Sequence, residues 1–230
     1  MYITHRRGDA IVTENRARVR ILIVDDHPSV REGLSLRISL HPDLEVCGEA
    51  DTEAQALALV VETHPDLVLI DISLKSGNGI ELIKRIRAHD RTIKMLVITG
   101  FQESLYAERA FRAGALGYLN KQESNEKMIE AIRTVLSGER FLSPEISRRL
   151  INQALGATDV TRTPIENLTD RELEIFQMIG EGLTTSTIAK RLFLSTHTID
   201  THRENIKRKL AISNAAELSR TAVQWVLENS

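Results

Sequence analysis

The 230-residue sequence contains one cysteine, Cys47, and no long apolar run. A single cysteine excludes an internal disulfide and suits a reducing compartment, so we expect a cytoplasmic protein. No apolar run approaches the roughly 18 residues of a membrane span, and the N-terminus lacks the apolar core of a secretory signal. We therefore expect a globular chain that does not bind membranes. The net charge of −2 does not indicate a nucleic-acid binder, and such a function would need a local basic patch.

The sequence does contain a regular alternation of short apolar runs with amphipathic segments over its first 140 residues. Apolar residues recur at helical spacing in the segments between and after the runs. Repeated strand–helix units predict a doubly wound parallel sheet with helices on both faces, an α/β fold. The expected strands are five, at residues 20–24, 44–50, 66–70, 94–98 and 117–120. The expected helices lie at residues 30–40, 52–64, 79–89, 104–114 and 123–138.

The pattern changes after Gly138. Residues 139–167 contain two prolines and Gly156, and they predict a linker with one short helix around 144–155. After the linker, only helical periodicity remains. The expected segments are a flexible N-terminal arm at 1–18, an α/β domain at 19–138, the linker at 139–167, and a smaller all-α domain of four helices at 168–230.

Three carboxylates follow the first and third expected strands. Asp25 and Asp26 end the run "ILIVDD", and Asp71 ends "DLVLID". In a doubly wound sheet these two strands are neighbours, so their carboxyl ends meet at one edge. Carboxylates that converge repel one another unless a cation lies among them, and hard oxygen ligands favour Mg²⁺. The adjacent His27 is a weaker candidate ligand because Mg²⁺ prefers oxygen.

Two further polar residues end later strands of the same sheet. Thr99 ends "KMLVIT" and Lys121 follows "GYLN". A hydroxyl, an ammonium and Mg²⁺ around a carboxylate would make a pocket for a phosphoryl group. We therefore predict that Asp71 attacks a phosphoryl group and carries it as an acyl phosphate. The alternative interpretation is that Asp71 only caps the helix that follows it.

The acidic pair, the strand-end Asp and Thr, and "GALGYLNK" resemble the receiver domain of two-component response regulators. The resemblance implies a flavodoxin-like fold and a sensor histidine kinase as phosphodonor to Asp71. It also implies that Asp26, Asp71 and the backbone carbonyl of Ser73 bind Mg²⁺, with Asp25 helping through water. By the same resemblance, Thr99 and Lys121 would contact the phosphoryl oxygens. Thr99 and Tyr118 would be the switch residues, although a tyrosine taken alone is more often a core aromatic than a switch. Lys75 departs from the family, which usually has a proline four residues after the phosphorylated Asp. A proline would stiffen the loop, so we expect the loop to be looser with Lys75 in its place.

The C-terminal segment contains the signals of a helix-turn-helix. Thr169 and Glu172 have capping-box spacing, and Ser195 is the expected N-cap of the helix over 196–210. In that helix Ile199, Ile206 and Leu210 would face the core, while the opposite face is polar and flanked by cations. Such a helix can enter a DNA major groove, with cations on phosphates and polar groups on base edges.

Residues 168–210 resemble a LuxR-type helix-turn-helix domain, so the whole chain is similar to NarL/FixJ-type response regulators. The resemblance implies binding to double-stranded DNA, control of transcription, and a homodimer in the phosphorylated state. The residues expected at the DNA are Ser195, His197, Thr198, Asp200, Thr201, Arg203, Glu204, Asn205, Lys207, Arg208 and Lys209. Trp225 and Val226 are candidates for a dimer contact or for burial within the domain.

Two alternative functions are weighed against a phosphorylation-switched regulator. A DNA-binding regulator that does not use phosphate has only Lys75 in its support. A phosphatase that forms an aspartyl phosphate usually needs a second acid two residues after the nucleophile, and Ser73 stands there instead. We therefore expect a non-enzymatic regulator, with autophosphatase activity at most.

Overall fold

A computed structural model describes residues 18–74, 77–100, 103–154 and 163–229. Residues 1–17 of the predicted arm, Lys75 and residues 155–162 of the predicted linker lie outside the described residues. Among the described residues, no helix combines the length and the apolar character needed to cross a bilayer.

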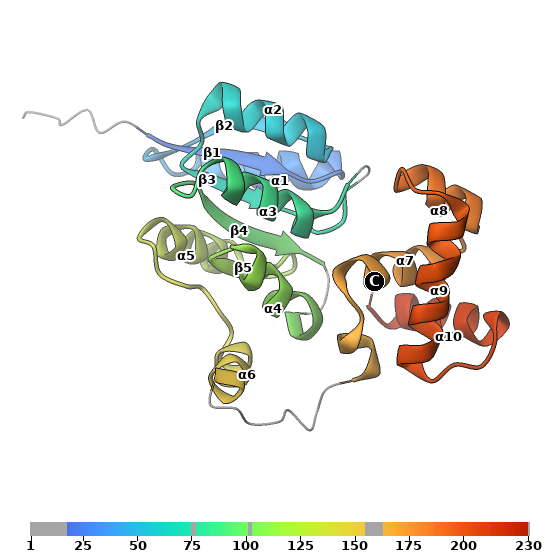
Figure 1. Cartoon of the computed structure of the whole chain (residues 1–230). Helices are drawn as coiled ribbons and strands as arrows, with labels where there is room; N and C mark the ends of the chain where they lie inside the picture. Colours follow the sequence, from blue (N-terminus) through green and yellow to red (C-terminus); the bar gives the residue numbers. More distant parts are fainter. Residues whose placement is uncertain (1–17, 75–76, 101–102, 155–162, 230) are drawn as a thin grey trace, which may run out of the picture.

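The first part of the chain is a five-stranded, all-parallel sheet with strand order β2-β1-β3-β4-β5. This confirms the predicted doubly wound fold, including the pairing of the first and third strands (Figure 1). The strands are β1 (Val19–Val24), β2 (Leu44–Ala50), β3 (Leu67–Ile70), β4 (Lys94–Thr99) and β5 (Gly117–Asn120). The connecting helices are α1 (Pro28–Ser39), α2 (Glu53–Thr63), α3 (Gly79–His89), α4 (Glu103–Ala113) and α5 (Asn125–Leu136).

Both faces of the sheet are covered by helices, which explains why the strands are apolar along their whole length. Alternate residues of one strand point to opposite faces. Ile21 and Ile23 of β1 pack with α1 and α5, whereas Leu22 and Val24 pack with α2, α3 and α4. The polar residues that follow the strands are therefore the first positions where functional side chains can lie at the edge of the sheet.

In the C-terminal part, the regular elements among the described residues are all helices. Helix α6 (Pro144–Ala154) is the short helix expected in the linker, and a 3₁₀ turn, η1 (Pro164–Asn167), precedes the last four helices. Those helices are α7 (Asp170–Gly180), α8 (Thr185–Arg191), α9 (Thr196–Leu210) and α10 (Ala215–Asn229). Helices α8 and α9 form the predicted helix-turn-helix. Thr169 and Glu172 form the predicted capping box, and Ser195 caps α9 as expected.

Helices α7 and α10 pack together at the centre of the C-terminal part. Gly180 allows the close approach, because a Cβ there would lie 2.4 Å from the carbonyl oxygen of Ala222. The rings of Phe176 and Trp225 lie 5.7 Å apart, and Trp225 is buried. Of the two alternatives for Trp225, burial within the domain is therefore the one observed. Figure 1 shows α7 beside the sheet edge where β3 and β4 end, with α9 further away from the sheet.

Candidate functional site

The strand register brings the predicted acidic residues together at the carboxyl edge of the sheet. Val24 pairs with Ile70, so Asp25 and Asp71 follow neighbouring strand ends. The backbone amide of Asp71 donates to the carbonyl of Val24 at 2.8 Å, and that of Lys121 donates to the carbonyl of Thr99 at 2.9 Å. These main-chain hydrogen bonds fix the backbone at Asp71 and Lys121, so the hydrogen bonding of the sheet determines where the two side chains begin.

Lys121 bridges two buried carboxylates. Its ammonium lies 2.6 Å from Oδ2 of Asp25 and 2.8 Å from Oδ2 of Asp71, which are 1% and 3% exposed. Burial raises the pKa of Asp71 above its ordinary value; the Lys121 ammonium opposes the rise and the Asp25 carboxylate adds to it. Burial alone would lower the pKa of Lys121, but the two carboxylates outweigh it and raise that pKa. One ammonium thus forms ion pairs with two carboxylates, which leaves a net negative charge. The site can therefore hold a further positive charge.

Asp71 does not cap the next helix, which rules out the alternative interpretation of this residue. Helix α3 is capped by Asn78, whose side chain accepts a hydrogen bond from the amide of Ile80 at 2.8 Å. Gly79 lets the start of α3 lie against the end of β3, because a Cβ there would be 2.2 Å from the carbonyl oxygen of Asp71. The glycine-containing loop after β3 therefore leaves the Asp71 carboxylate free to face the site.

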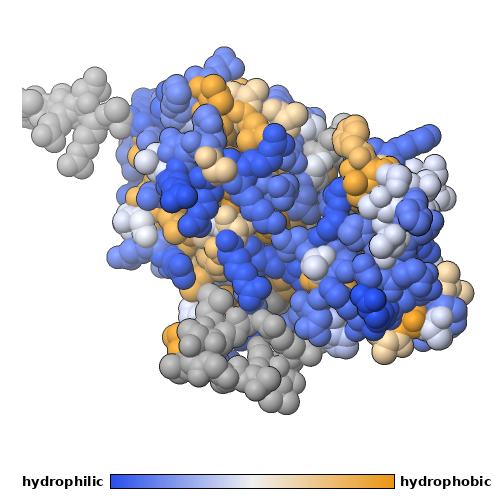
Figure 2. All heavy atoms as spheres, viewed as in Figure 1, coloured by the Kyte–Doolittle hydropathy of each residue, from blue (hydrophilic) through white to orange (hydrophobic). Residues whose placement is uncertain are grey.

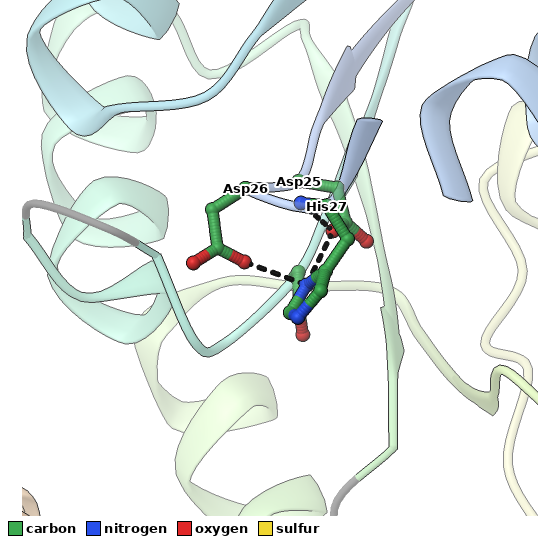
Figure 3. Close-up of side chains that lie close together, drawn as sticks. Asp25, Asp26 and His27 are labelled. Atoms are coloured by element: carbon green, nitrogen blue, oxygen red, sulfur yellow. Dashed lines mark hydrogen bonds and ion pairs between the residues drawn. The ribbon is translucent and has the colours of Figure 1, made fainter. Parts of the chain in front are cut away.

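Four residues offer ligand atoms within 4.8 Å of one another: Asp25, Asp26, His27 and Asp71. Figure 3 shows the His27 ring turned toward both neighbouring carboxylates, with Nδ1 2.8 Å from Oδ1 of Asp26 and 3.3 Å from Oδ1 of Asp25. Oδ1 of Asp26 and Oδ1 of Asp71 are buried and accept no hydrogen bond of normal geometry from the described residues. Buried carboxylate oxygens without a donor fit a hard cation such as Mg²⁺.

The remaining predicted residues of the site lie around the same carboxylate. Thr99 is fully buried, and its hydroxyl lowers the pKa of Asp71. Ser73 lines the same cavity as Asp71, Thr99 and Lys121. Tyr118 is 2% exposed and belongs to the apolar core beside α4, and burial raises the pKa of its hydroxyl well above the ordinary value. The tyrosine that sequence reasoning assigned to a switch thus points inward in this structure.

Helix α9 presents the expected polar face to solvent. Of the residues expected at the DNA, those with exposed side chains are Ser195, His197, Asp200, Thr201, Glu204 and Arg208. Those of Thr198, Arg203, Asn205, Lys207 and Lys209 are half-buried. Ile199 and Ile206 are fully buried, as predicted, whereas Leu210 is only partly buried.

Several predicted DNA contacts already have partners within the domain. Lys209 donates to Oε2 of Glu172 at 2.6 Å and to the carbonyl of Asn167 at 3.3 Å, so its ammonium faces α7. Lys207 pairs with Glu204 at 2.8 Å on the helix surface. Helical periodicity at 100° per residue puts Lys209 beside the polar face of α9. It does not indicate that Lys209 forms an ion pair with Glu172, the glutamate of the capping box.

Sequence reasoning missed the contacts that join the two parts of the chain. Asp170, at the start of α7, lies 3.0 Å from the ammonium of Lys84 and 2.9 Å from the guanidinium of Arg109. Each of these residues has the pattern of an ordinary surface charge on its own helix, so no local signal distinguishes it. Their pairing depends on where the helical part docks, which periodicity does not encode.

Comparisons with known proteins agree with this geometry. Residues 21–133 match the family described as "Response regulator receiver domain". Residues 166–222 match the family described as "Bacterial regulatory proteins, luxR family". The first match contains the acidic cluster, Thr99 and Lys121, and the second contains the helix-turn-helix.

Relatives align over nearly the full chain. Response regulator GacA from Pseudomonas viridiflava is 34% identical over 90% of this chain and 96% of its own. Transcriptional regulatory protein LiaR from Bacillus subtilis is 35% identical over 86% of this chain and 94% of its own. A crystal structure of a LuxR-family response regulator from Aurantimonas sp. SI85-9A1 covers 60% of this chain and 99% of its own, at 37% identity and a TM-score of 0.55. RcsB from Salmonella enterica serovar Typhimurium covers 90% of this chain and 99% of its own, at 23% identity and a TM-score of 0.68, and resembles it in fold.

Proposed function

The chain belongs to the response regulators of two-component systems, with a receiver domain and a LuxR-type DNA-binding domain that regulates transcription, and we propose that Asp71 is its phosphoacceptor. The observation that carries this proposal is the environment of Asp71. Its carboxylate is buried at the end of β3, held by Lys121 on one oxygen, and has the other oxygen without a hydrogen-bond donor among the described residues. The expected donor is the phosphohistidine of a sensor kinase.

In the transfer step, a carboxylate oxygen of Asp71 attacks the phosphorus, an O–P bond forms and the P–N bond to the donor imidazole breaks. The imidazole leaves with the bonding electron pair and takes up a proton. Lys121 stays beside the new acyl phosphate, where its ammonium offsets charge on the phosphoryl oxygens. Thr99 lies beside the same carboxylate and can donate its hydroxyl to a phosphoryl oxygen.

Asp25, Asp26, Asp71 and the carbonyl of Ser73 are the groups that we propose to hold Mg²⁺. The buried Oδ1 of Asp71, which accepts no hydrogen bond from the described residues, supports this set, as does the buried Oδ1 of Asp26, beside which only the His27 ring nitrogen lies among the described residues. Bound there, Mg²⁺ would supply the positive charge that a phosphoryl group needs beside three carboxylates. His27 contacts two of these carboxylates, so we propose that it restrains them rather than serving as a ligand itself.

Thr99 and Tyr118 remain our proposal for the switch that passes the phosphorylation signal to the face of α4 and β5. We propose functional units at 19–138 and 168–230, with the linker at 139–167 and the arm at 1–18. Output would be sequence-specific binding of α9 to double-stranded DNA, by a homodimer when phosphorylated. We propose at most autophosphatase activity, because Ser73 offers no carboxylate as a second acid.

The proposal is tested by labelling the full chain with acetyl phosphate and Mg²⁺ and measuring acid-labile phosphate. We expect Asp71→Ala to remove the label completely, because no other nucleophile replaces the carboxylate. Asp43→Ala is the matched control, since Asp43 forms an exposed ion pair with Arg133 near the start of β2, away from the site. Undiminished labelling of Asp71→Ala would contradict the assignment.

A further inference from the structure

The cavity in front of Asp71 is not made by the receiver domain alone. It has a volume of about 450 Å³, and the end of α7 and α10 form its far wall. The receiver contributes Asp71, Thr99 and Lys121, and the C-terminal domain contributes Gln177, Glu181 and Trp225. Asp71 and Trp225, which are 154 positions apart in the sequence, therefore line one pocket. The edge at which a kinase would deliver its phosphoryl group is the edge on which the C-terminal domain lies.

A set of ionic contacts holds the C-terminal domain in this position. Arg109 of α4 is only 11% exposed in its side chain, and it donates to Asp170 at 2.9 Å and to the carbonyls of Glu166 and Leu168 at 3.1 and 2.6 Å. Lys84 of α3 reaches the other Asp170 oxygen at 3.0 Å. We call Asp170 with Lys84 and Arg109 the docking clamp. A carboxylate with two cations is a stronger contact than an isolated surface pair.

Polar and apolar contacts continue from the clamp toward the phosphoacceptor. The hydroxyl of Tyr106 donates to Oε1 of Gln177 at 3.3 Å, and Gln177 in turn donates to Glu181 at 3.0 Å. Leu74, after β3, and Leu173, on α7, line a narrow interdomain gap and are 3% and 1% exposed. The apolar core on this side of the sheet is continuous with the core of the C-terminal domain. The docked arrangement is therefore a packed interface.

The docked arrangement leaves the DNA-reading side open. The outward side chains of α9, including His197, Thr201 and Arg208, remain exposed while α7 and α10 face the receiver. In Figure 2 the surface of the C-terminal domain on this face is largely hydrophilic. Docking thus covers the phosphoacceptor edge and does not cover the recognition helix. What it restricts is access to Asp71.

We propose that the docked C-terminal domain selects the phosphodonor: small donors reach Asp71 through the pocket, whereas a protein donor requires the docking clamp to open. This inference rests on the proposed function of Asp71. A cavity of about 450 Å³ is within the range that accepts a small molecule such as phosphoramidate. A phosphohistidine carried by a folded domain must bring its own helices to the same edge, which α7 and α10 occupy. Protein donors would therefore react only with the undocked fraction of molecules.

The experiment compares two donors on the full chain. Phosphoramidate is the small donor; its P–N bond breaks as the O–P bond to Asp71 forms, and ammonia leaves. The large donor is a phosphorylated histidine-phosphotransfer domain, taken as the fastest of a panel. Initial labelling rates are measured for wild type, Asp170→Ala and Lys84→Ala, with Asp43→Ala as the matched Asp→Ala control. Thermal unfolding of each variant verifies that it is folded.

We expect Asp170→Ala to raise the rate with the protein donor roughly tenfold, since the clamp limits the donor-competent fraction. The rate with phosphoramidate should change less than about threefold, because the small donor enters either state. Lys84→Ala removes one of the two cations and should give a smaller rise, and Asp43→Ala should give none. The inference is overturned if the ratio of the protein-donor rate to the phosphoramidate rate is the same in Asp170→Ala as in wild type. This includes the case in which both rates rise equally, because the substitution would then have changed the reactivity of Asp71 and not the access to it. If neither donor labels any variant, the proposed function fails as well.

Discussion

The sheet edge that carries Asp71, our proposed phosphoacceptor, and helix α9, our proposed recognition helix, are built in opposite ways. At the edge, Asp25 and Asp71 are almost fully buried and share one ammonium, and backbone hydrogen bonds of the sheet fix their positions. On α9 the polar face is exposed, and two of its lysines form ion pairs within the domain, Lys207 with Glu204 and Lys209 with Glu172. The surrounding fold fixes the position of each side chain in a buried site. On an exposed helix face, the fold does not determine which side chains contact DNA. The variants described next test this contrast, from the largest expected effect to the smallest.

The largest effect should come from Asp26→Ala at the edge. Loss of a residue that only orients a metal ligand weakens metal binding roughly 10–100-fold, and loss of a ligand should weaken it at least as much. We therefore expect the Mg²⁺-dependent binding of beryllium fluoride to become undetectable. Trp225, the only tryptophan of the chain, lines the cavity and provides the fluorescence readout. Unchanged affinity would remove Asp26 from the metal site, and Asp43→Ala serves as control.

On the recognition helix, single changes should have graded effects. Arg208 is exposed, and its guanidinium donates a hydrogen bond to Oδ1 of Asn205 on the same helix, at 2.9 Å. We expect Arg208→Ala to weaken DNA binding roughly tenfold and to reduce the salt slope by about 1, as for one lost phosphate contact. The measurement is fluorescence anisotropy at several salt concentrations, on a duplex selected by the protein from random sequence. A tenfold loss without a change of slope would assign Arg208 to a base instead.

The buried carboxylate should reduce the stability of the protein in the absence of metal. The raised pKa of Asp71 means that the folded protein binds this proton more tightly than the unfolded chain does. Its contribution to the free energy of unfolding is therefore greatest below the ordinary pKa of 3.8 and is lost as pH rises through the raised value. At neutral pH without Mg²⁺, Asp71→Asn should have a higher free energy of unfolding than wild type.

This difference should disappear toward pH 4 and shrink when Mg²⁺ is added, because the cation stabilises only the wild-type site. Urea unfolding across the pH range provides the measurement. An Asp71→Asn variant that is less stable than wild type at neutral pH would show that the carboxylate is well stabilised in the apo site.

The smallest effect on DNA binding should come from Lys209, which the sequence grouped with Arg208. Burial opposes ionisation of Glu172, but the hydrogen bond from Lys209 and those from Thr169 outweigh it and lower the Glu172 pKa. Lys209→Ala should therefore change DNA affinity less than about twofold and destabilise the C-terminal domain by about 1 kcal/mol. Lys207→Ala is the matched control, and its surface pair should contribute under about 0.5 kcal/mol to stability. A large loss of affinity in Lys209→Ala would mean that its ammonium leaves Glu172 on DNA.

Most of the fold, and the grouping of polar residues at the carboxyl edge of the sheet, could be predicted from the sequence, for a physical reason. The β-strands are apolar along their length and end in polar residues, so strand ends and neighbouring order follow from periodicity and topology, as the Val24–Ile70 pairing illustrates. The capping residues Thr169 and Ser195 were also readable, because capping is local.

Contacts between distant helices could not be predicted in the same way. The clamp around Asp170 and the position of Lys209 against Glu172 depend on packing between segments that are far apart in sequence. Each of these side chains is consistent with an ordinary solvated charge when it is read within its own helix. The burial of Trp225 belongs to the same class, because the choice between a dimer contact and the core depends on how α7 meets α10.

The most direct test of the account is to locate the phosphorylated residue chemically. The full chain is incubated with phosphoramidate, reduced with borohydride to convert an aspartyl phosphate to homoserine, digested, and sequenced by mass spectrometry. The account predicts homoserine at position 71 alone, with Mg²⁺ present and not after chelation. Homoserine at Asp25, Asp26 or any other position, or at position 71 irrespective of Mg²⁺, would contradict the role assigned to the cluster at the end of β3.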